Sequence, residues 1–72
     1  MKYEIILYWS EADDAFIAEI PELSGCMADG KTMTEALHNV QIVAQEWIET
    51  ARELGRELGR EIPVPKGRLQ YA

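Results

Sequence analysis

The strongest structural signal in this sequence lies in residues 32–54, which read TMTEALHNVQIVAQEWIETAREL. Thr32 and Glu35 have the spacing of a capping box, in which a hydroxyl and a carboxylate satisfy free backbone amides at the start of a helix. Apolar residues then recur at helical spacing, which predicts one long helix with a single apolar stripe. The stripe consists of Met33, Leu37, Val40, Ala44, Trp47, Ala51 and Leu54.

The end of this helix is ambiguous in the sequence. The unit Glu-Leu-Gly-Arg occurs twice in tandem, at residues 53–56 and 57–60. A glycine just past the last helical residue is a common helix terminator, so either Gly55 or Gly59 ends the helix. Glycine inside a helix costs about 1 kcal/mol relative to alanine, and glutamate–arginine pairs one turn apart offset part of that cost. We expect the longer helix.

The residues around the helix indicate strands. Residues 2–9 and 15–20 each alternate in the manner of a strand, and the polar loop between them is short enough for an antiparallel hairpin. Residues 26–28 form a short third strand, and residues 67–72, GRLQYA, form a possible fourth. We therefore predict an α+β fold in which one long helix packs on a small antiparallel three-stranded sheet.

A chain of 72 residues has room for one domain, residues 1–72, with a marginal core. Domains of this size usually gain stability from disulfides, a metal ion or oligomerisation. The single cysteine, Cys26, excludes an intramolecular disulfide, and a single histidine beside it argues against a zinc site. We expect a homo-oligomer with no metal and no cofactor. The candidate oligomer contacts are Ile6, Tyr8 and Ile42, apolar residues outside the predicted core.

The charge is unevenly distributed along the chain. Residues 1–51 contain ten acidic and two basic residues, a net charge of −8, whereas residues 52–72 carry a net charge of +2. A strongly acidic body disfavours binding to nucleic acid and favours a basic partner. The candidate partner contacts are Glu11, Asp13 and Asp14 at the hairpin tip. The sequence shows neither a signal peptide nor an apolar run that spans a membrane, so we expect a cytoplasmic protein.

No set of residues has the spacing of a catalytic site. His38 lies on the polar side of the predicted helix, and no serine or cysteine is placed to pair with it. The adjacent acids of the hairpin tip point in different directions, so they do not form a metal shell. Cys26 is predicted to be a small core residue instead of a nucleophile. We do not expect an enzyme.

The segment from Glu19 to Leu37 resembles the HicB family of type II toxin–antitoxin antitoxins. The matching residues are Pro21, Leu23, Gly25, Cys26, Gly30, Thr32, Glu35 and Ala36. The resemblance runs through essentially the whole chain and implies a partial RNase H-like fold. It also implies a function, which is to bind and neutralise a HicA toxin, a small basic mRNA interferase with a double-stranded-RNA-binding-like fold and a catalytic histidine.

The chain departs from the family pattern in two places. Many HicB antitoxins carry a C-terminal DNA-binding domain, and this chain ends at Ala72 without one. We therefore expect no operator binding. The doubled Glu-Leu-Gly-Arg unit adds a turn or a loop relative to the usual pattern. The alternative to an antitoxin is an oligomeric interaction module of the same fold that has no toxin partner.

Overall fold

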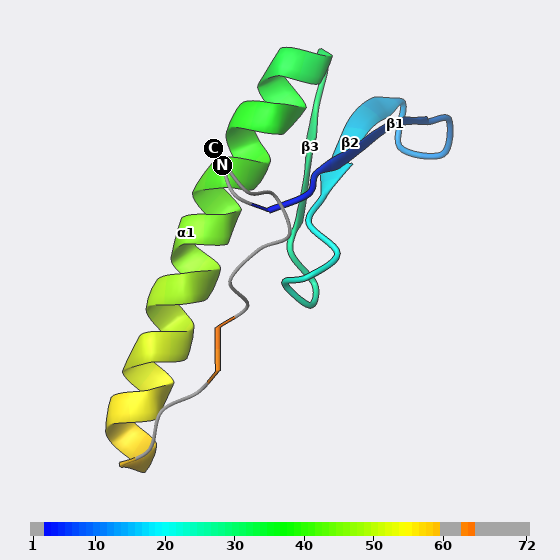
Figure 1. The fold of residues 1–72 in the computed structure, drawn as a ribbon. Helices are drawn as coiled ribbons and strands as arrows, with labels where there is room; N and C mark the ends of the chain where they lie inside the picture. Colours follow the sequence, from blue (N-terminus) through cyan, green and yellow to red (C-terminus); the bar gives the residue numbers. More distant parts are fainter. Residues whose placement is uncertain (1–2, 60–62, 65–72) are drawn as a thin grey trace, which may run out of the picture.

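The structure is a computed structural model that describes residues 3–59 and 63–64, and it contains one sheet and one helix (Figure 1). The elements are β1 (Ile6–Ser10), β2 (Ala15–Glu19), β3 (Met27–Gly30) and α1 (Met33–Leu58). The strands form an antiparallel sheet in the order β1-β2-β3. The α+β fold is therefore confirmed. The possible fourth strand, residues 67–72, lies outside the described residues.

The sheet has two faces that differ in what covers them. Ala18 of β2 lies opposite Leu7 of β1 and Ala28 of β3, and residues paired across an antiparallel sheet share one face. Ala18 is completely buried in the core beside helix residues, so these three residues mark the face that α1 covers. The alternate residues of each strand lie on the other face, which we call the open face.

The core lies between α1, the helix-covered face of the sheet and the turn that joins β2 to β3. Its buried members are Tyr3, Ala18, Ile20, Leu23, Cys26, Ala36, Val40 and Ala44. Several of the residues in the contact are alanine, which allows the helix to approach the sheet closely. The turn is closed by backbone hydrogen bonds, among them the Cys26 amide to the Leu23 carbonyl at 2.9 Å. The prediction that Cys26 is a core residue is confirmed.

Both ends of α1 follow the sequence signals. At the start, the Glu35 amide donates to the Thr32 hydroxyl at 3.0 Å, one of the two bonds of a capping box. At the end, Gly59 has φ 66°, a left-handed conformation that suits glycine, and its amide donates to the Arg56 carbonyl at 3.2 Å. The helix therefore continues through Gly55, as the longer of the two alternatives predicted.

The predicted apolar stripe, which we expect to cover one face of the sheet, is buried in its middle and exposed at its ends. Val40 and Ala44 are fully buried, whereas Met33 and Leu54 are 57% and 45% exposed. A helix of 26 residues is about 39 Å long, but five-residue strands span only about 17 Å. The C-terminal half of α1 consequently extends past the sheet (Figure 1).

Replacing Thr32 with alanine is expected to lower the free energy of unfolding by about 1 kcal/mol, because the Glu35 amide loses its hydrogen-bond acceptor. Urea denaturation followed by circular dichroism measures the change. Thr34→Ala is the matched control, since Thr34 is an exposed residue inside the first helical turn and alanine is the better helix former there. Equal losses in the two variants would show that the cap bond contributes nothing.

Candidate functional site

The open face of the sheet carries a patch of exposed apolar side chains. Ile6, Tyr8 and Met27 are 43%, 42% and 49% exposed, and they surround Ile17, which is 8% exposed. Strand pairing brings them together, because Tyr8 lies opposite Ile17 and the open-face residues of each strand alternate with core residues. The helix packs on the other side of the sheet, so these side chains remain accessible.

Acidic side chains from three different parts of the chain border this patch. Glu19 of β2 lies opposite Ile6 and Met27, and Asp29 of β3 lies opposite Ile17. Asp13 of the β1–β2 loop joins them along a shallow hollow of about 380 Å³. The hollow is lined by Tyr8, Asp13, Ile17, Met27, Ala28 and Asp29. We refer to the four apolar residues and these three acids as the acidic face.

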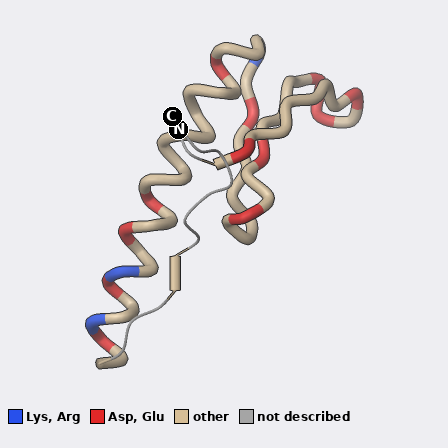
Figure 2. Tube along the Cα trace, viewed as in Figure 1, with Lys and Arg blue, Asp and Glu red and all other residues tan. Residues whose placement is uncertain are grey.

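The sheet and its loops carry acidic side chains and no basic ones. Residues 3–30 contain seven acidic residues and neither lysine nor arginine. Figure 2 shows acidic residues on the strands and both loops, whereas the basic residues lie at the start of α1 and along its C-terminal half. The described basic residues are Lys31, Arg52 and Arg56. The acidic face therefore presents a negative potential to an approaching molecule.

Tyr8 links the apolar and acidic parts of the face. Its hydroxyl donates to the Glu19 carboxylate at 3.1 Å. Partial desolvation, this hydrogen bond and the negative charge of Glu19 raise the pKa of the Tyr8 phenol, and the charge of Asp13 adds to the effect. The phenol therefore stays protonated and continues to donate, which holds the Glu19 carboxylate over the open face.

The three predicted partner contacts all lie exposed in the β1–β2 loop, but they are not equivalent. The Ser10 hydroxyl donates to the Asp13 carboxylate at 3.0 Å and accepts from the Asp13 amide at 3.3 Å. Asp14 has a left-handed backbone with φ 51°. Of the three, only Asp13 lines the hollow beside Tyr8, whereas Glu11 and Asp14 extend the acidic surface along the loop.

The structure combines residues that the sequence placed in separate sets. Ile6 and Tyr8, predicted as oligomer contacts, lie on the same face as Asp13, a predicted partner contact. Ile42 lies elsewhere, because it follows the buried Val40 by two residues, about 200° around the helix. Its 44% exposed side chain is therefore on the outer side of α1 and cannot form one surface with Ile6.

Sequence reasoning missed part of the acidic face. Ile17 and Glu19 alternate with Phe16 and Ala18, so the period of the strand indicates that they share the opposite face. Met27 and Asp29 have no comparable signal, because their places depend on the register of β3 against β2. These residues become part of the face only once that register is known.

The described residues show no feature of a metal centre. Within residues 3–59 and 63–64, no group of three or more His, Cys, Asp or Glu side chains is placed to hold a metal ion. The same residues include no helix that is long and apolar enough to cross a membrane. His38 is exposed on α1.

In the folded protein, Cys26 is expected to react with iodoacetamide about tenfold or more slowly than in urea. Its side chain is 3% exposed, and desolvation raises the pKa of the thiol, so the reactive thiolate is scarce. The raised pKa also makes stability depend on pH. The contribution of the protonated Cys26 thiol to the free energy of unfolding is full below the ordinary thiol pKa of 9.0, and it is lost as the pH rises through the raised value. Mass spectrometry of timed samples measures the rates. Equal rates in the two conditions would contradict a buried core thiol.

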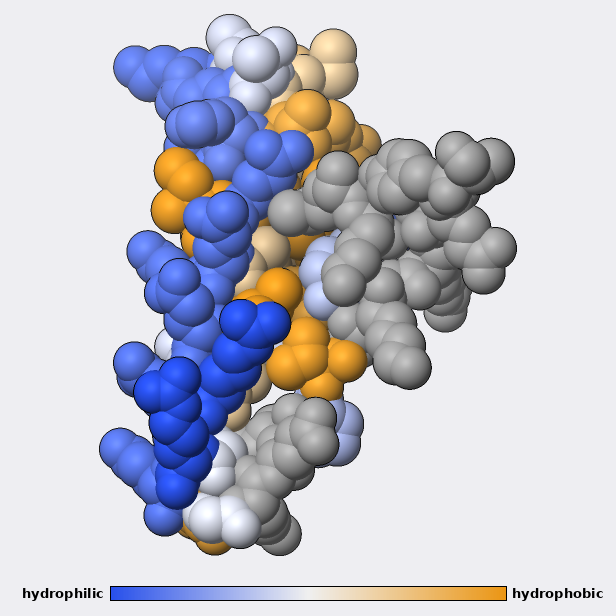
Figure 3. All heavy atoms as spheres, turned by 60° about the vertical axis from the view of Figure 1, so that its left-hand side comes forward, coloured by the Kyte–Doolittle hydropathy of each residue, from blue (hydrophilic) through white to orange (hydrophobic). Residues whose placement is uncertain are grey.

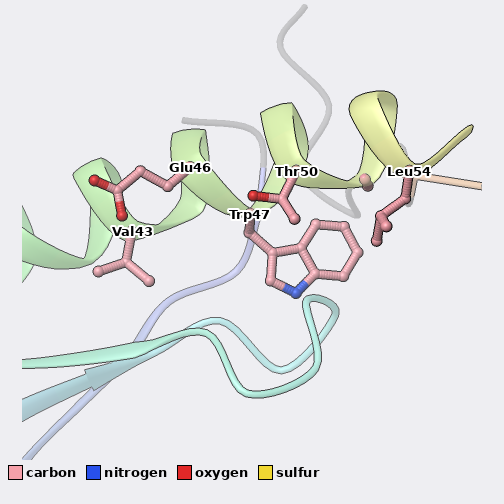
Figure 4. A pocket seen from close by; sticks show the side chains of 6 residues that line it. Val43, Glu46, Trp47, Thr50 and Leu54 are labelled. Carbon is pink, nitrogen blue, oxygen red and sulfur yellow. The ribbon is translucent and has the colours of Figure 1, made fainter. Parts of the chain in front are cut away.

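A second hollow, of about 420 Å³, lies along the C-terminal half of α1 (Figure 4). It is lined by Val43, Glu46, Trp47, Thr50, Ala51 and Leu54. The Trp47 indole extends from α1 toward the β2–β3 turn, where its Nε1 donates to the Ser24 carbonyl at 3.0 Å. Apolar groups gather beside the hydrophilic side of the helix (Figure 3). Trp47 is thus half-buried at the edge of the core and anchors the helix to that turn.

Comparison with known proteins identifies the family. The model of a family described as UPF0150-like matches residues 2–59. The chain belongs to this family. A UPF0150 protein from Synechocystis sp. is 46% identical to this chain over 52 residues. The aligned residues are 72% of this chain and 70% of that relative. A UPF0150 protein from Thermoplasma acidophilum is 36% identical over 53 residues, 74% of this chain and 75% of that relative. No solved structure matches.

The family match covers β1, β2, β3 and α1, the elements that the structure describes, and therefore the whole acidic face. It begins before β1 and ends at Gly59, the residue that terminates α1. The names of the two relatives state the family and no partner or reaction.

Proposed function

We propose that this UPF0150-like protein is an antitoxin-like inhibitor that binds a small basic toxin of the HicA type and neutralises it without catalysis. The observation that carries the proposal is the acidic face, where carboxylates surround exposed apolar side chains on a sheet whose residues, 3–30, include no lysine or arginine. In this proposal the protein acts in the cytoplasm and the acidic face covers the surface with which the toxin holds RNA. The protein itself needs no cofactor and does not contact nucleic acid.

Charge and apolar area have different roles in this binding. The carboxylates of Asp13, Glu19 and Asp29 attract a basic protein over a distance and orient it, which raises the association rate at low salt. Burial of Ile6 and Met27 then supplies binding free energy that salt does not screen. A surface built to bind phosphate is basic, so it is complementary to this face and unable to bind RNA while covered.

The resemblance to HicB antitoxins supports the proposal through the fold. Four of its eight matching residues, Leu23, Cys26, Gly30 and Ala36, are buried, so they maintain the core and the contact between helix and sheet. None of the four belongs to the acidic face. The motif therefore supports a common fold, and the charge of the sheet supports the choice of partner.

The test is affinity capture of the tagged protein from a lysate of its source organism at low and high salt. We expect recovery of a small basic protein, less of it at high salt, that cleaves RNA once separated. Adding the UPF0150-like protein back should stop the cleavage. Recovery of no basic protein at low salt, or RNA cleavage that continues after the addition, would contradict the proposed function.

An oligomeric module without a toxin is the second candidate, and the exposed Ile6 and Tyr8 are the observation that favours it. If the open face joins the subunits, Ile6→Lys should convert the oligomer to a monomer in sedimentation velocity. Ile42→Lys is the matched control, because the two isoleucines are 43% and 44% exposed and lie on opposite sides of the domain. If the Ile6→Lys variant sediments as the wild type does, the open face is excluded as the subunit contact.

A further inference from the structure

We propose that the hollow on the acidic face binds the guanidinium group of one arginine side chain of the basic partner. This inference rests on the proposed function, because it takes the partner to be a basic protein. It adds the chemical group that the partner inserts and the residues that receive it. The acidic face then selects arginine over lysine, in addition to attracting positive charge.

A row of residues from all three strands crosses the sheet at this hollow. Tyr8 of β1 lies opposite Ile17 of β2, and Ile17 lies opposite Asp29 of β3. Neighbouring strands are about 5 Å apart, so an apolar residue separates the phenol from the carboxylate. Met27 lines the same hollow, and its volume of about 380 Å³ is within the range of pockets that hold small ligands. The hollow therefore has an apolar floor with polar groups at its border.

Two carboxylates reach the hollow from different elements, and the fold holds both in place. Asp13 comes from the β1–β2 loop, where its carboxylate accepts from the Ser10 hydroxyl at 3.0 Å and its amide donates to the same oxygen at 3.3 Å. Asp29 comes from β3, and its backbone carbonyl accepts from the Asn39 side chain of α1 at 2.8 Å. Groups that are held before binding lose less conformational entropy when a ligand arrives.

Tyr8 adds a third acceptor to the hollow. Its hydroxyl donates to the Glu19 carboxylate at 3.1 Å, so the phenol oxygen is left to accept a hydrogen bond from a ligand. Asp13 is close enough for its negative charge to raise the pKa of this phenol, which places the two groups on the same side of the hollow. The ring of a tyrosine also attracts a guanidinium over its face.

This arrangement fits a guanidinium better than an ammonium. A guanidinium is planar and weakly hydrated, and its five N–H donors have fixed directions, so it can bond several separate acceptors at once. The aliphatic stem of an arginine can lie along Ile17 and Met27 while its charged end meets the carboxylates. A lysine ammonium is compact and strongly hydrated, and it would lose water over the apolar floor.

The distribution of charge favours a partner as the source of the arginine. Residues 3–30 contain neither lysine nor arginine. The described arginines lie on the C-terminal half of α1 (Figure 2), and α1 packs on the other side of the sheet. Arg60, Lys66 and Arg68 lie outside the described residues, so their role as occupants is tested with a variant of their own.

The test is an NMR titration of the full chain with capped tripeptides at low salt. Each peptide has alanine on both sides of a central arginine, lysine or citrulline, and citrulline keeps the shape of arginine without its charge. We expect the arginine peptide to shift the amides of Tyr8, Ile17 and Asp29. It should bind about threefold or more tightly than the lysine peptide, and about tenfold or more tightly than the citrulline peptide.

A matched pair of variants tests whether the peptide binds in the hollow. Asp29→Asn keeps the shape of the side chain and removes its charge, so it should weaken the arginine peptide about fivefold or more. Glu49→Gln makes the same change in charge at an exposed position of α1 and should leave the affinity nearly unchanged. The NMR spectra of the free variants show whether each retains the fold. Equal losses in the two variants would overturn the proposal.

A triple variant, Arg60→Gln with Lys66→Gln and Arg68→Gln, distinguishes the partner from this chain's own basic residues. If a partner supplies the arginine, the variant should keep the wild-type ratio of arginine-peptide to lysine-peptide affinity. A larger ratio would show that residues of this chain occupy the hollow, and it would overturn the proposal.

The peptides also separate this proposal from the proposed function. Equal affinity for the arginine and lysine peptides would show that charge alone attracts them, which overturns the arginine site and leaves the proposed function in place. If no peptide shifts the amides of the acidic face, the hollow is not a binding site. Capture of an RNA-cleaving basic protein then decides separately whether the proposed function holds.

Discussion

Replacing Gly30 with alanine is expected to destabilise the protein by about 3 kcal/mol, the upper end of the usual range for overpacking a core. A Cβ atom at Gly30 would overlap the backbone nitrogen of Ala36 and lie 2.9 Å from the carbonyl carbon of Glu35. Both atoms belong to the first turn of α1, so no side-chain rotation relieves the collision. The helix would have to move away from β3, and a domain this small has only about 3–5 kcal/mol to lose.

Urea denaturation measures this loss, and Gly25→Ala provides the control. Gly25 has φ 76°, and a Cβ atom added there would meet no heavy atom within 4 Å, so alanine at this position experiences backbone strain alone and costs about 1–2 kcal/mol. Asparagine tolerates the left-handed region, so Gly25→Asn should recover part of the loss, whereas Gly30→Asn should not. A Gly30→Ala variant as stable as the wild type would show that α1 can move away from β3 without a measurable cost in free energy.

The sequence predicts the local features of this fold well, because each depends on neighbouring residues. The cap at Thr32 and the terminator at Gly59 are both found where short-range hydrogen bonding and backbone preference place them. The alternation that predicts a strand over residues 15–20 also matches the structure, where Phe16 and Ala18 lie on one face and Ile17 on the other. Burial of Cys26 follows from its small apolar character and from the absence of a second cysteine in the sequence.

Features that depend on the size and register of the sheet could not be predicted in the same way. Met33 and Leu54 fit the helical period, but they are exposed because the sheet is shorter than the helix, and periodicity contains no information about sheet length. β1 is apolar on both faces, so its sequence does not show which face the helix covers. The acidic face also needs Asp29, whose position depends on the pairing of β3 with β2.

The double variant Asp13→Asn with Asp29→Lys is expected to weaken binding of the basic partner about tenfold. It removes two negative charges from the acidic face and adds one positive charge, and each exposed pair contributes a modest part of the affinity. Asparagine at position 13 keeps an oxygen that can accept from the Ser10 hydroxyl, so the loop conformation should persist. The Asp29 side chain is exposed, which makes lysine tolerable there.

Calorimetric titration with the captured basic protein measures the change. The effect should shrink as salt is raised, because mobile ions screen exposed charges beyond about 10 Å at 0.1 M ionic strength. The association rate should fall more than the dissociation rate rises, since long-range attraction acts on the encounter. Unfolding in urea, measured alongside, should show stability close to that of the wild type.

Glu49→Gln with Glu53→Lys is the matched control for this double variant. It makes the same change in net charge on exposed positions of α1, which packs on the opposite side of the sheet from the acidic face. If binding depends on where the carboxylates lie, the control should lose less than about twofold in affinity. Equal losses in the two double variants would show that the partner responds to net charge alone, and the acidic face would then have no special role in the proposed function.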